Sequence, residues 1–217
     1  MNDSQALRTM MVDTQVRPSD VTKFPIIEAM LTIPREDYVP DAVRAAAYAD
    51  APVDLGGGRA MLEPRTFAKI LDAVAIEPDD LVLDLGAGLG YSAAVIARMA
   101  EFVVALEEDE DLAAEAEARL AAAGIDNVAV MAGPLAEGDP RHGPYDVIVV
   151  EGAVQEVPLP ILEQIKDGGR IVAIFDGNYL GTVRIGYRVG TDIDGRPAFD
   201  AAATVLPGFT AAPEFAL

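Results

Sequence analysis

Short apolar runs recur through the middle of the chain, at 81–85, 102–106, 128–131, 146–150 and 170–175. Helical spacing of apolar residues fills most of the intervals between them. Uninterrupted apolar runs are typical of strands that are buried on both faces, and right-handed crossovers join such strands into a doubly wound parallel sheet. The sequence therefore predicts an α/β fold of the Rossmann-like kind.

The two ends of the chain have different patterns. Residues 4–48 contain short helical stretches that prolines interrupt, and a triplet of glycines follows at 56–58. Pro64 then opens a predicted helix. We expect residues 1–60 to form a helical segment and a loop that pack on the same domain, and residues 61–217 to form the cofactor-binding domain itself.

The tail returns to strand-like patterns at 182–189 and 198–206. Between them lies Asp194-Gly195, a dipeptide that favours the tight turn of a β-hairpin. The sequence thus predicts a mostly parallel sheet that ends in an antiparallel hairpin with its turn at this dipeptide. Such an outline is typical of Rossmann-like methyltransferases.

Composition removes several classes of function. The formal net charge is -20, which disfavours nucleic acids and anionic membranes as partners. The chain has no cysteine, so thiolate nucleophiles and cysteine-based zinc sites are excluded. No apolar run reaches the roughly 18 residues that a membrane span needs, and the N-terminal stretch lacks the pattern of a signal peptide. We therefore expect a cytoplasmic protein without a resident metal.

The most specific motif is D-L-G-A-G-L-G at residues 84–90, which follows a predicted strand and opens a predicted helix. Gly86 and Gly88 permit a tight turn and a close approach of the backbone to a ligand. Free N–H groups at the helix start favour a carboxylate, while Asp84 can accept from an ammonium group. S-adenosylmethionine carries both groups. A tight strand–helix turn without a ligand is the alternative.

The next strand ends at Glu107, about 20 residues after the glycines. A carboxylate in this place can hold the two ribose hydroxyls of a nucleoside. Its alternative role is to cap the next helix within the acidic run 107–111. The end of the third strand is expected beside the adenine. The expected cofactor-binding residues are Asp84, Gly86, Ala87, Gly88, Gly90, Tyr91, Glu107, Glu108, Gly133, Pro134, Leu135 and Glu151.

Several stretches together resemble the protein-L-isoaspartate O-methyltransferase family, over residues ~8 to ~175. They are MVDTQVRPSDVTKFPIIEAMLTIPREDYVP, LVLDLGAGLGYSAAVIA, VVALEED, YDVIVVEGAVQEVP and ILEQIKDGGRIVAI. The resemblance implies methyl transfer from S-adenosylmethionine to the side carboxylate of an isomerised aspartate, the first step in its repair. The implied partner is a protein or peptide acceptor.

The departures from the family pattern fall where the acceptor is expected. Leu62 stands where the family has a serine beside the reacting carboxylate, and Ala60 replaces a threonine. Pro134 matches an aspartate on the adenine side, and Glu151-Gly152 replaces small residues after the fourth strand. We assign no catalytic residue. The expected substrate residues are Met61, Leu62, Pro64 and Arg65.

Two arginines offer a replacement for the lost hydroxyl. Arg59 and Arg65 flank the changed segment, and a guanidinium can bind a carboxylate with two hydrogen bonds. Arg65 as an exposed residue of the first helical turn is the alternative. Three functions stay open: isoaspartyl methylation, methylation of a different acceptor, and cofactor binding without catalysis. An NAD-dependent oxidoreductase is disfavoured, because Tyr91 stands where its third glycine would be.

Overall fold

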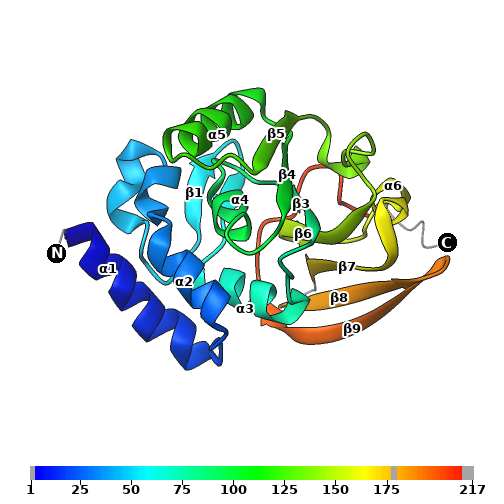
Figure 1. The fold of residues 1–217 in the computed structure, drawn as a ribbon, viewed down its shortest axis with the longest axis horizontal. Helices are drawn as coiled ribbons and strands as arrows, with labels where there is room; N and C mark the ends of the chain where they lie inside the picture. The colour runs from blue at the N-terminus through cyan, green and yellow to red at the C-terminus, as the bar shows by residue number, and fades with distance from the viewer. Residues whose placement is uncertain (1–2, 177–179, 212–217) are drawn as a thin grey trace, which may run out of the picture.

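The computed structural model describes residues 3–176 and 180–211. Its centre is a seven-stranded sheet of order β5-β4-β3-β6-β7-β8-β9 (Figure 1). The strands are β3 (Leu81–Leu85), β4 (Phe102–Glu107), β5 (Val128–Ala132), β6 (Tyr145–Val154), β7 (Ile165–Phe175), β8 (Gly181–Val189) and β9 (Asp192–Ala201). β3 to β7 are parallel, whereas β8 and β9 are antiparallel, which confirms the predicted Rossmann-like fold.

Helices cover both faces of this sheet. They are α1 (Asp3–Met11), α2 (Phe24–Thr32), α3 (Pro64–Val74), α4 (Tyr91–Ile96), α5 (Glu110–Ala122) and α6 (Leu159–Glu163). Short helical turns lie at Val12–Val16, Arg17–Ser19, Arg35–Tyr38, Asp41–Ala46 and Leu135–Glu137. α2 packs against α3 and α4, and α1 packs against α2 at the blue end of Figure 1. α3 begins at Pro64 as predicted, since proline lacks the N–H that the first helical turn leaves unpaired.

Adjacent residues of each central strand enter opposite cores. Val82 and Val147 pack with the N-terminal helices, α3 and α4, whereas Leu83 and Ile148 pack with α6 and the C-terminal stretch. All four side chains are fully buried. Successive strand residues point to opposite faces, so a run that is buried on both sides must be apolar throughout. This explains the uninterrupted apolar runs in the sequence.

The C-terminal hairpin exists, but the turn predicted at Asp194-Gly195 is wrong. The ladder closes with Val189 opposite Asp192, and Asp194-Gly195 pairs with β8 inside β9. The turn contains Gly190 instead, which has φ +63° and whose N–H donates to Asp167 Oδ1 at 2.8 Å. A glycine in the left-handed region and an anchor on β7 thus outweigh the Asp-Gly signal.

A second, two-stranded sheet lies apart from the main one. β1 (Val53–Gly56) and β2 (Arg59–Met61) form a hairpin whose turn is Gly57-Gly58, the last two residues of the glycine triplet. Its side chains reach the carboxyl ends of β3 and β4, because Leu55 packs at Gly88 and Arg59 contacts Glu107. The hairpin therefore covers the region that carries the motifs. In the part of the chain that the structure describes, every helix is too short or too polar for a bilayer span.

Candidate active site

Three carboxyl groups converge at the carboxyl ends of neighbouring strands. Asp84 is the last residue but one of β3, Glu107 ends β4, and both are fully buried. Glu151 lies near the end of β6 and is 7% exposed. Parallel strands bring their carboxyl ends to one edge of the sheet, where ligands of this fold class bind. Three buried acids at this edge therefore mark a binding site.

The glycine motif makes the bend that the sequence predicts. Gly86, Gly88 and Gly90 all have positive φ, at 83°, 56° and 91°. A Cβ on Gly88 would lie 2.6 Å from Leu55 Cδ1, so a larger residue here would have to displace the Leu55 side chain of the hairpin. The backbone N–H groups of Gly86 and Ala87 donate to Leu106 O at 2.8 and 3.2 Å. The bend is thus fixed to β4 and carries the chain into α4.

Asp84 is a buried acid with one free oxygen. Its Oδ2 accepts from the Ser92 hydroxyl at 2.6 Å, whereas Oδ1 has no hydrogen-bond partner among the described residues. Burial raises the pKa of Asp84 to about 7; repulsion by Glu107 adds to the increase, while the Ser92 hydrogen bond opposes it. An unpaired buried acceptor is costly, so this oxygen is suited to a donor from a ligand.

Glu107 accepts hydrogen bonds from several donors. The N–H of Gly88 donates to Oε2 at 2.8 Å, and the N–H groups of Glu108 and Asp109 donate to Oε1 at 2.9 and 3.3 Å. The Arg59 side chain adds bonds from Nε to Oε1 at 3.3 Å and from an Nη to Oε2 at 3.0 Å. Asp109, by contrast, caps α5 through its own side chain, which leaves Glu107 to the site.

Sequence reasoning did not find the pair between Arg59 and Glu107. The two residues lie 48 positions apart, and both are buried. The guanidinium also donates to Gly86 O at 2.9 Å, so it lies on the glycine bend and on the predicted ribose carboxylate together. The fold of β2 over the sheet edge creates this contact, and no local sequence pattern announces it.

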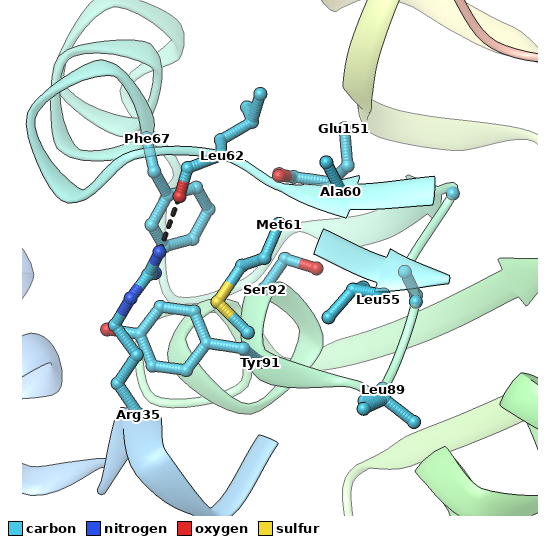
Figure 2. Close-up of a pocket in the computed structure, with 13 residues that line it drawn as sticks. Arg35, Leu55, Ala60, Met61, Leu62, Phe67, Leu89, Tyr91, Ser92 and Glu151 are labelled. Carbon is cyan, nitrogen blue, oxygen red and sulfur yellow. Dashed lines mark hydrogen bonds between the residues drawn. The ribbon is translucent and has the colours of Figure 1, made fainter. Parts of the chain in front are cut away.

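Two adjoining cavities meet at the hairpin. The first is lined by the glycine bend, α4 and β2, and holds only about 10 Å³ of free space (Figure 2). The second lies between β2, the end of β6 and the C-terminal stretch, and measures about 280 Å³. Ala60, Leu62 and Glu151 line both cavities. A small molecule on the glycine bend and a second molecule in the larger cavity would therefore meet at these three residues.

Arg35 is a buried residue that fixes the backbone at Leu62. Its Nη donates to Leu62 O at 2.6 Å, the contact that is dashed in Figure 2, and its Nε donates to Ala47 O at 2.7 Å. The guanidinium lies 4.8 Å from the centre of the Tyr91 ring, and burial lowers the pKa of Arg35. Arg35 thereby ties the N-terminal segment to the wall of both cavities.

Tyr91 begins α4 and is part of an aromatic cluster. Its ring centre lies 6.0 Å from that of Tyr38 and 5.7 Å from that of Phe67. The ring lines the first cavity, its hydroxyl has no partner among the described residues, and burial raises the pKa of that hydroxyl. The residue therefore packs the floor of the site and keeps one free polar atom there.

Glu151 reaches the cavities through a bulge in β6. Val149 pairs with Val172 and Ala153 with Ile174, so β6 carries two extra residues between these pairs. Glu151 Oε1 has no partner among the described residues. Burial, with repulsion by Asp84 in second place, raises the pKa of Glu151 well above its usual range. The buried site thus favours the uncharged form of this carboxyl group.

Gly152 completes the bulge. A Cβ on this residue would lie 2.5 Å from Leu206 Cδ2, so the C-terminal stretch can pack here only against a glycine. The N–H of Ala153 then donates to Thr204 O at 2.9 Å, and the N–H of Leu206 donates to Ala153 O at 2.9 Å. The bulge thus fixes one wall of the second cavity to the C-terminal stretch.

Four further expected site residues lie in two different parts of the structure. Met61 lines the first cavity, whereas Gly133, Pro134 and Leu135 line neither of the two. The N–H of Gly133 donates to the backbone oxygen of Glu107 at 3.0 Å, which places the end of β5 beside that of β4. The adenine contact at these residues stays a prediction.

Pro64 and Arg65, the first two residues of α3, line neither cavity. Arg65 forms an exposed pair with Glu63 at 3.0 Å, which agrees with the alternative of a first-turn surface residue. Pro64 is buried at the first position of the helix. Glu108 is exposed, and only its backbone N–H contacts Glu107. Of the two arginines considered from sequence, the structure therefore brings only Arg59 to the site.

Comparison with known proteins gives the family. The protein-L-isoaspartate(D-aspartate) O-methyltransferase family matches residues 8–183. The chain is 39% identical over 170 residues to the protein-L-isoaspartate O-methyltransferase of Methylorubrum extorquens, covering 78% of this chain and 74% of that protein. It is 36% identical over 184 residues to the enzyme of that name from Methanoregula boonei, covering 85% of each. The chain belongs to the protein-L-isoaspartate O-methyltransferase family.

Solved structures agree on the fold. A protein-L-isoaspartate O-methyltransferase superposes with a TM-score of 0.81 at 24% identity, covering 94% of this chain and 66% of that chain. A putative family member from Plasmodium falciparum, solved with S-adenosyl-L-homocysteine, superposes with a TM-score of 0.78 at 18% identity, covering 95% and 99%. Members of the family are S-adenosylmethionine-dependent methyltransferases, and the resemblance inferred from the sequence motifs is confirmed.

Proposed function

We propose that the protein is an S-adenosylmethionine-dependent methyltransferase that esterifies the side carboxylate of isoaspartyl residues in proteins or peptides. The observation that carries the proposal is the joint position of the glycine bend, Asp84 and Glu107 at one sheet edge of a chain whose family match spans residues 8–183. The setting that belongs to this activity is protein repair in the cytoplasm. The net charge of -20 supports a protein acceptor over nucleic acid.

The residues at the sheet edge fit S-adenosylmethionine. The unpaired Oδ1 of Asp84 is suited to the ammonium group of its methionine part. The glycine bend lets the backbone approach that part closely, and Glu107 is placed for the ribose hydroxyls. We propose these residues as the cofactor site, with Ala87, Gly90 and Tyr91 supporting the bend.

The chemistry asks little acid–base help from the protein. Bound S-adenosylmethionine supplies an electrophilic methyl group, and a carboxylate is already ionised at neutral pH. Positioning of the acceptor and exclusion of water are then the main tasks. Leu62 and Ala60 give the shared wall an apolar surface, and Arg35 fixes the Leu62 backbone. The loss of a hydroxyl at position 62 is therefore compatible with catalysis.

Tritiated-methyl transfer tests the proposal. We expect the wild-type protein to label an isoaspartyl peptide and to leave the matching aspartyl peptide unlabelled. The Leu62→Ser variant reintroduces a hydroxyl on the shared wall and should label the isoaspartyl peptide more strongly. Its melting temperature serves as a control, because truncation of the buried leucine costs about 3 kcal/mol.

Two outcomes would change the assignment. If the wild type gives no label and Leu62→Ser does, the acceptor of the natural protein is not an isoaspartyl peptide. If neither protein gives label, although both bind S-adenosyl-L-homocysteine in a calorimeter, the chain is a cofactor-binding protein without this activity. Equal label in both proteins would show that position 62 does not control the acceptor.

A further inference from the structure

Arg59 lies at the boundary of the two cavities. Its guanidinium contacts Glu107 and Gly86 O on the side of the glycine bend, and its side chain also lines the second cavity. A Cβ on Gly86 would lie 2.6 Å from an Arg59 Nη, so the guanidinium is packed directly on the bend. The side chain is only 6% exposed. One buried cation thus faces both sites.

The guanidinium of Arg59 occupies the hydrogen-bonding positions on Glu107 that the ribose hydroxyls would use. A carboxylate at the end of the second strand of this fold class accepts from the ribose, and both oxygens of Glu107 already accept from Arg59. Ribose binding at Glu107 therefore requires that Arg59 leave it. The proposed function and the observed ion pair are compatible only as alternating contacts.

Release of Arg59 leaves Glu107 well supported. The N–H groups of Gly88, Glu108 and Asp109 continue to donate to its two oxygens. Ribose hydroxyls would replace the guanidinium bonds. The carboxylate is consequently not left as an uncompensated buried charge, which is the usual cost of breaking such a pair.

The released guanidinium can bind an anionic group in the second cavity. Arg59 is the single cationic side chain that lines this cavity among residues 3–176 and 180–211. The remaining polar side chains of its wall are Glu151 and Thr204. In a chain of net charge -20, an anionic acceptor needs a local cation to bind. A guanidinium can hold one carboxylate oxygen pair in a fixed orientation.

We propose that Arg59 is an acceptor-binding residue that cofactor binding makes available: its guanidinium pairs with Glu107 until ribose hydroxyls displace it, and then binds the carboxylate of the peptide acceptor in the second cavity. This rests on the proposed function. In this proposal Arg59 orients the acceptor, a task that the apolar side chain at position 62 does not perform. It also makes cofactor and acceptor binding cooperative, since each favours the released state of one side chain.

The first experiment uses the unmodified protein. An isoaspartyl hexapeptide is titrated calorimetrically into the protein, with and without saturating S-adenosyl-L-homocysteine. We expect the nucleoside to tighten peptide binding about tenfold, within the usual range of coupling between two sites. By reciprocity, the peptide should tighten nucleoside binding by the same factor. Independent binding of the two, with no change in either dissociation constant, would overturn the proposal.

The second experiment removes the charge with Arg59→Gln. S-adenosyl-L-homocysteine should bind this variant about tenfold more tightly, because no ion pair has to be broken. Peptide binding in its presence should be weakened at least tenfold, and the coupling should disappear. The matched control is Arg98→Gln, which removes an exposed guanidinium that pairs with Glu28 outside both cavities. Weaker nucleoside binding by Arg59→Gln would show that Arg59 supports the cofactor and does not compete with it.

A third variant separates these outcomes from misfolding and from failure of the proposed function. Arg59→Lys keeps the charge but loses the bidentate fork, so it should retain part of the coupling. Nucleoside affinity is measurable without any methyl transfer, and it tests the competition at Glu107 even when no peptide is methylated. Absence of nucleoside binding by the wild type would instead contradict the proposed function itself.

Discussion

The two halves of the site are built in different ways. The half around Asp84, Glu107 and the glycine bend lies within residues 84–109, and backbone N–H groups of this stretch hold its carboxylate, with Arg59 of β2 as a distant contact. The half around Leu62 and Glu151 joins residues from the N-terminal segment, β2, the bulge of β6 and the C-terminal stretch. The comparison teaches that the first half is mostly a local unit, which one short stretch of sequence encodes. The second half changes whenever one of several distant segments changes.

The largest effect is expected at Glu107. Glu107→Gln removes the charge that three backbone donors and Arg59 hold, and should weaken S-adenosyl-L-homocysteine binding about 100-fold. The unfolding free energy should fall by about 3 kcal/mol, because a buried guanidinium loses its partner. Calorimetry and chemical denaturation measure the two effects.

The matched control for this change is Glu110→Gln in the first turn of α5, where the side chain is exposed. We expect no change in nucleoside affinity for the control. If Glu107→Gln binds the nucleoside as tightly as the wild type does, the local unit around β4 is not the ribose site, and the comparison between the two halves loses its basis.

The next effect is a pH dependence of nucleoside binding that Asp84 sets. Its pKa is raised to about 7 by burial, and an ammonium group prefers the ionised form. The ionised fraction at that pKa rises about tenfold from pH 6 to pH 8, so affinity should rise by about the same factor. Calorimetry in two buffers of different ionisation enthalpy should detect the proton released on binding. Asp84→Asn should bind weakly at both pH values.

The same shift makes the unliganded protein less stable as the pH increases. A carboxyl group whose folded pKa exceeds its unfolded value of 3.8 stabilises the fold fully below pH 4, and that contribution is lost as the pH rises through about 7. Asp84→Asn should therefore reduce the change in melting temperature between pH 4 and pH 7. A wild-type melting temperature that rises steadily over this window, with the same slope in the variant, would show that Asp84 is ionised in the fold.

The smallest effect is expected at Glu151 and sharpens the acceptor half of the comparison. Burial raises the pKa of Glu151 well above its usual range and so favours the uncharged form, which is why an uncharged amide should replace the carboxyl group with little cost. Glu151→Gln should change the unfolding free energy by less than about 0.5 kcal/mol at pH 6. At pH 9 the variant should be the more stable protein, because the stability contributed by a raised pKa is lost as the group ionises.

Thermal denaturation at both pH values measures this difference. The control is Glu156→Gln, which neutralises an exposed carboxylate shortly after β6 and should show no such change between pH 6 and pH 9. A loss of several degrees in Glu151→Gln at pH 6 would mean that the carboxyl is ionised there and paired with a cation. The second cavity would then offer a negative wall to its acceptor.

Features that depend on interactions between residues close in sequence could be predicted, whereas features that depend on distant segments could not. α3 begins at Pro64 and β3 spans Leu81–Leu85 as predicted, because proline at a helix start and uninterrupted apolar runs act locally. The turn at Asp194-Gly195 was predicted wrongly, since pairing with β8 and the anchor at Asp167 decided the register. Glu151 was placed near the cofactor by resemblance, but its position between two cavities follows from a bulge that no pattern signals.

By itself, the sequence determined the sheet, the glycine bend and the acids at the ends of β3 and β4. Each of these is encoded within a few residues, by burial on both faces, by positive φ and by position at a strand end. Only the tertiary structure decided that Arg59 contacts Glu107, that Arg35 holds Leu62 and that one Glu151 oxygen finds no partner within the described part of the chain. Such contacts join segments far apart in the chain, and packing rather than local preference selects them.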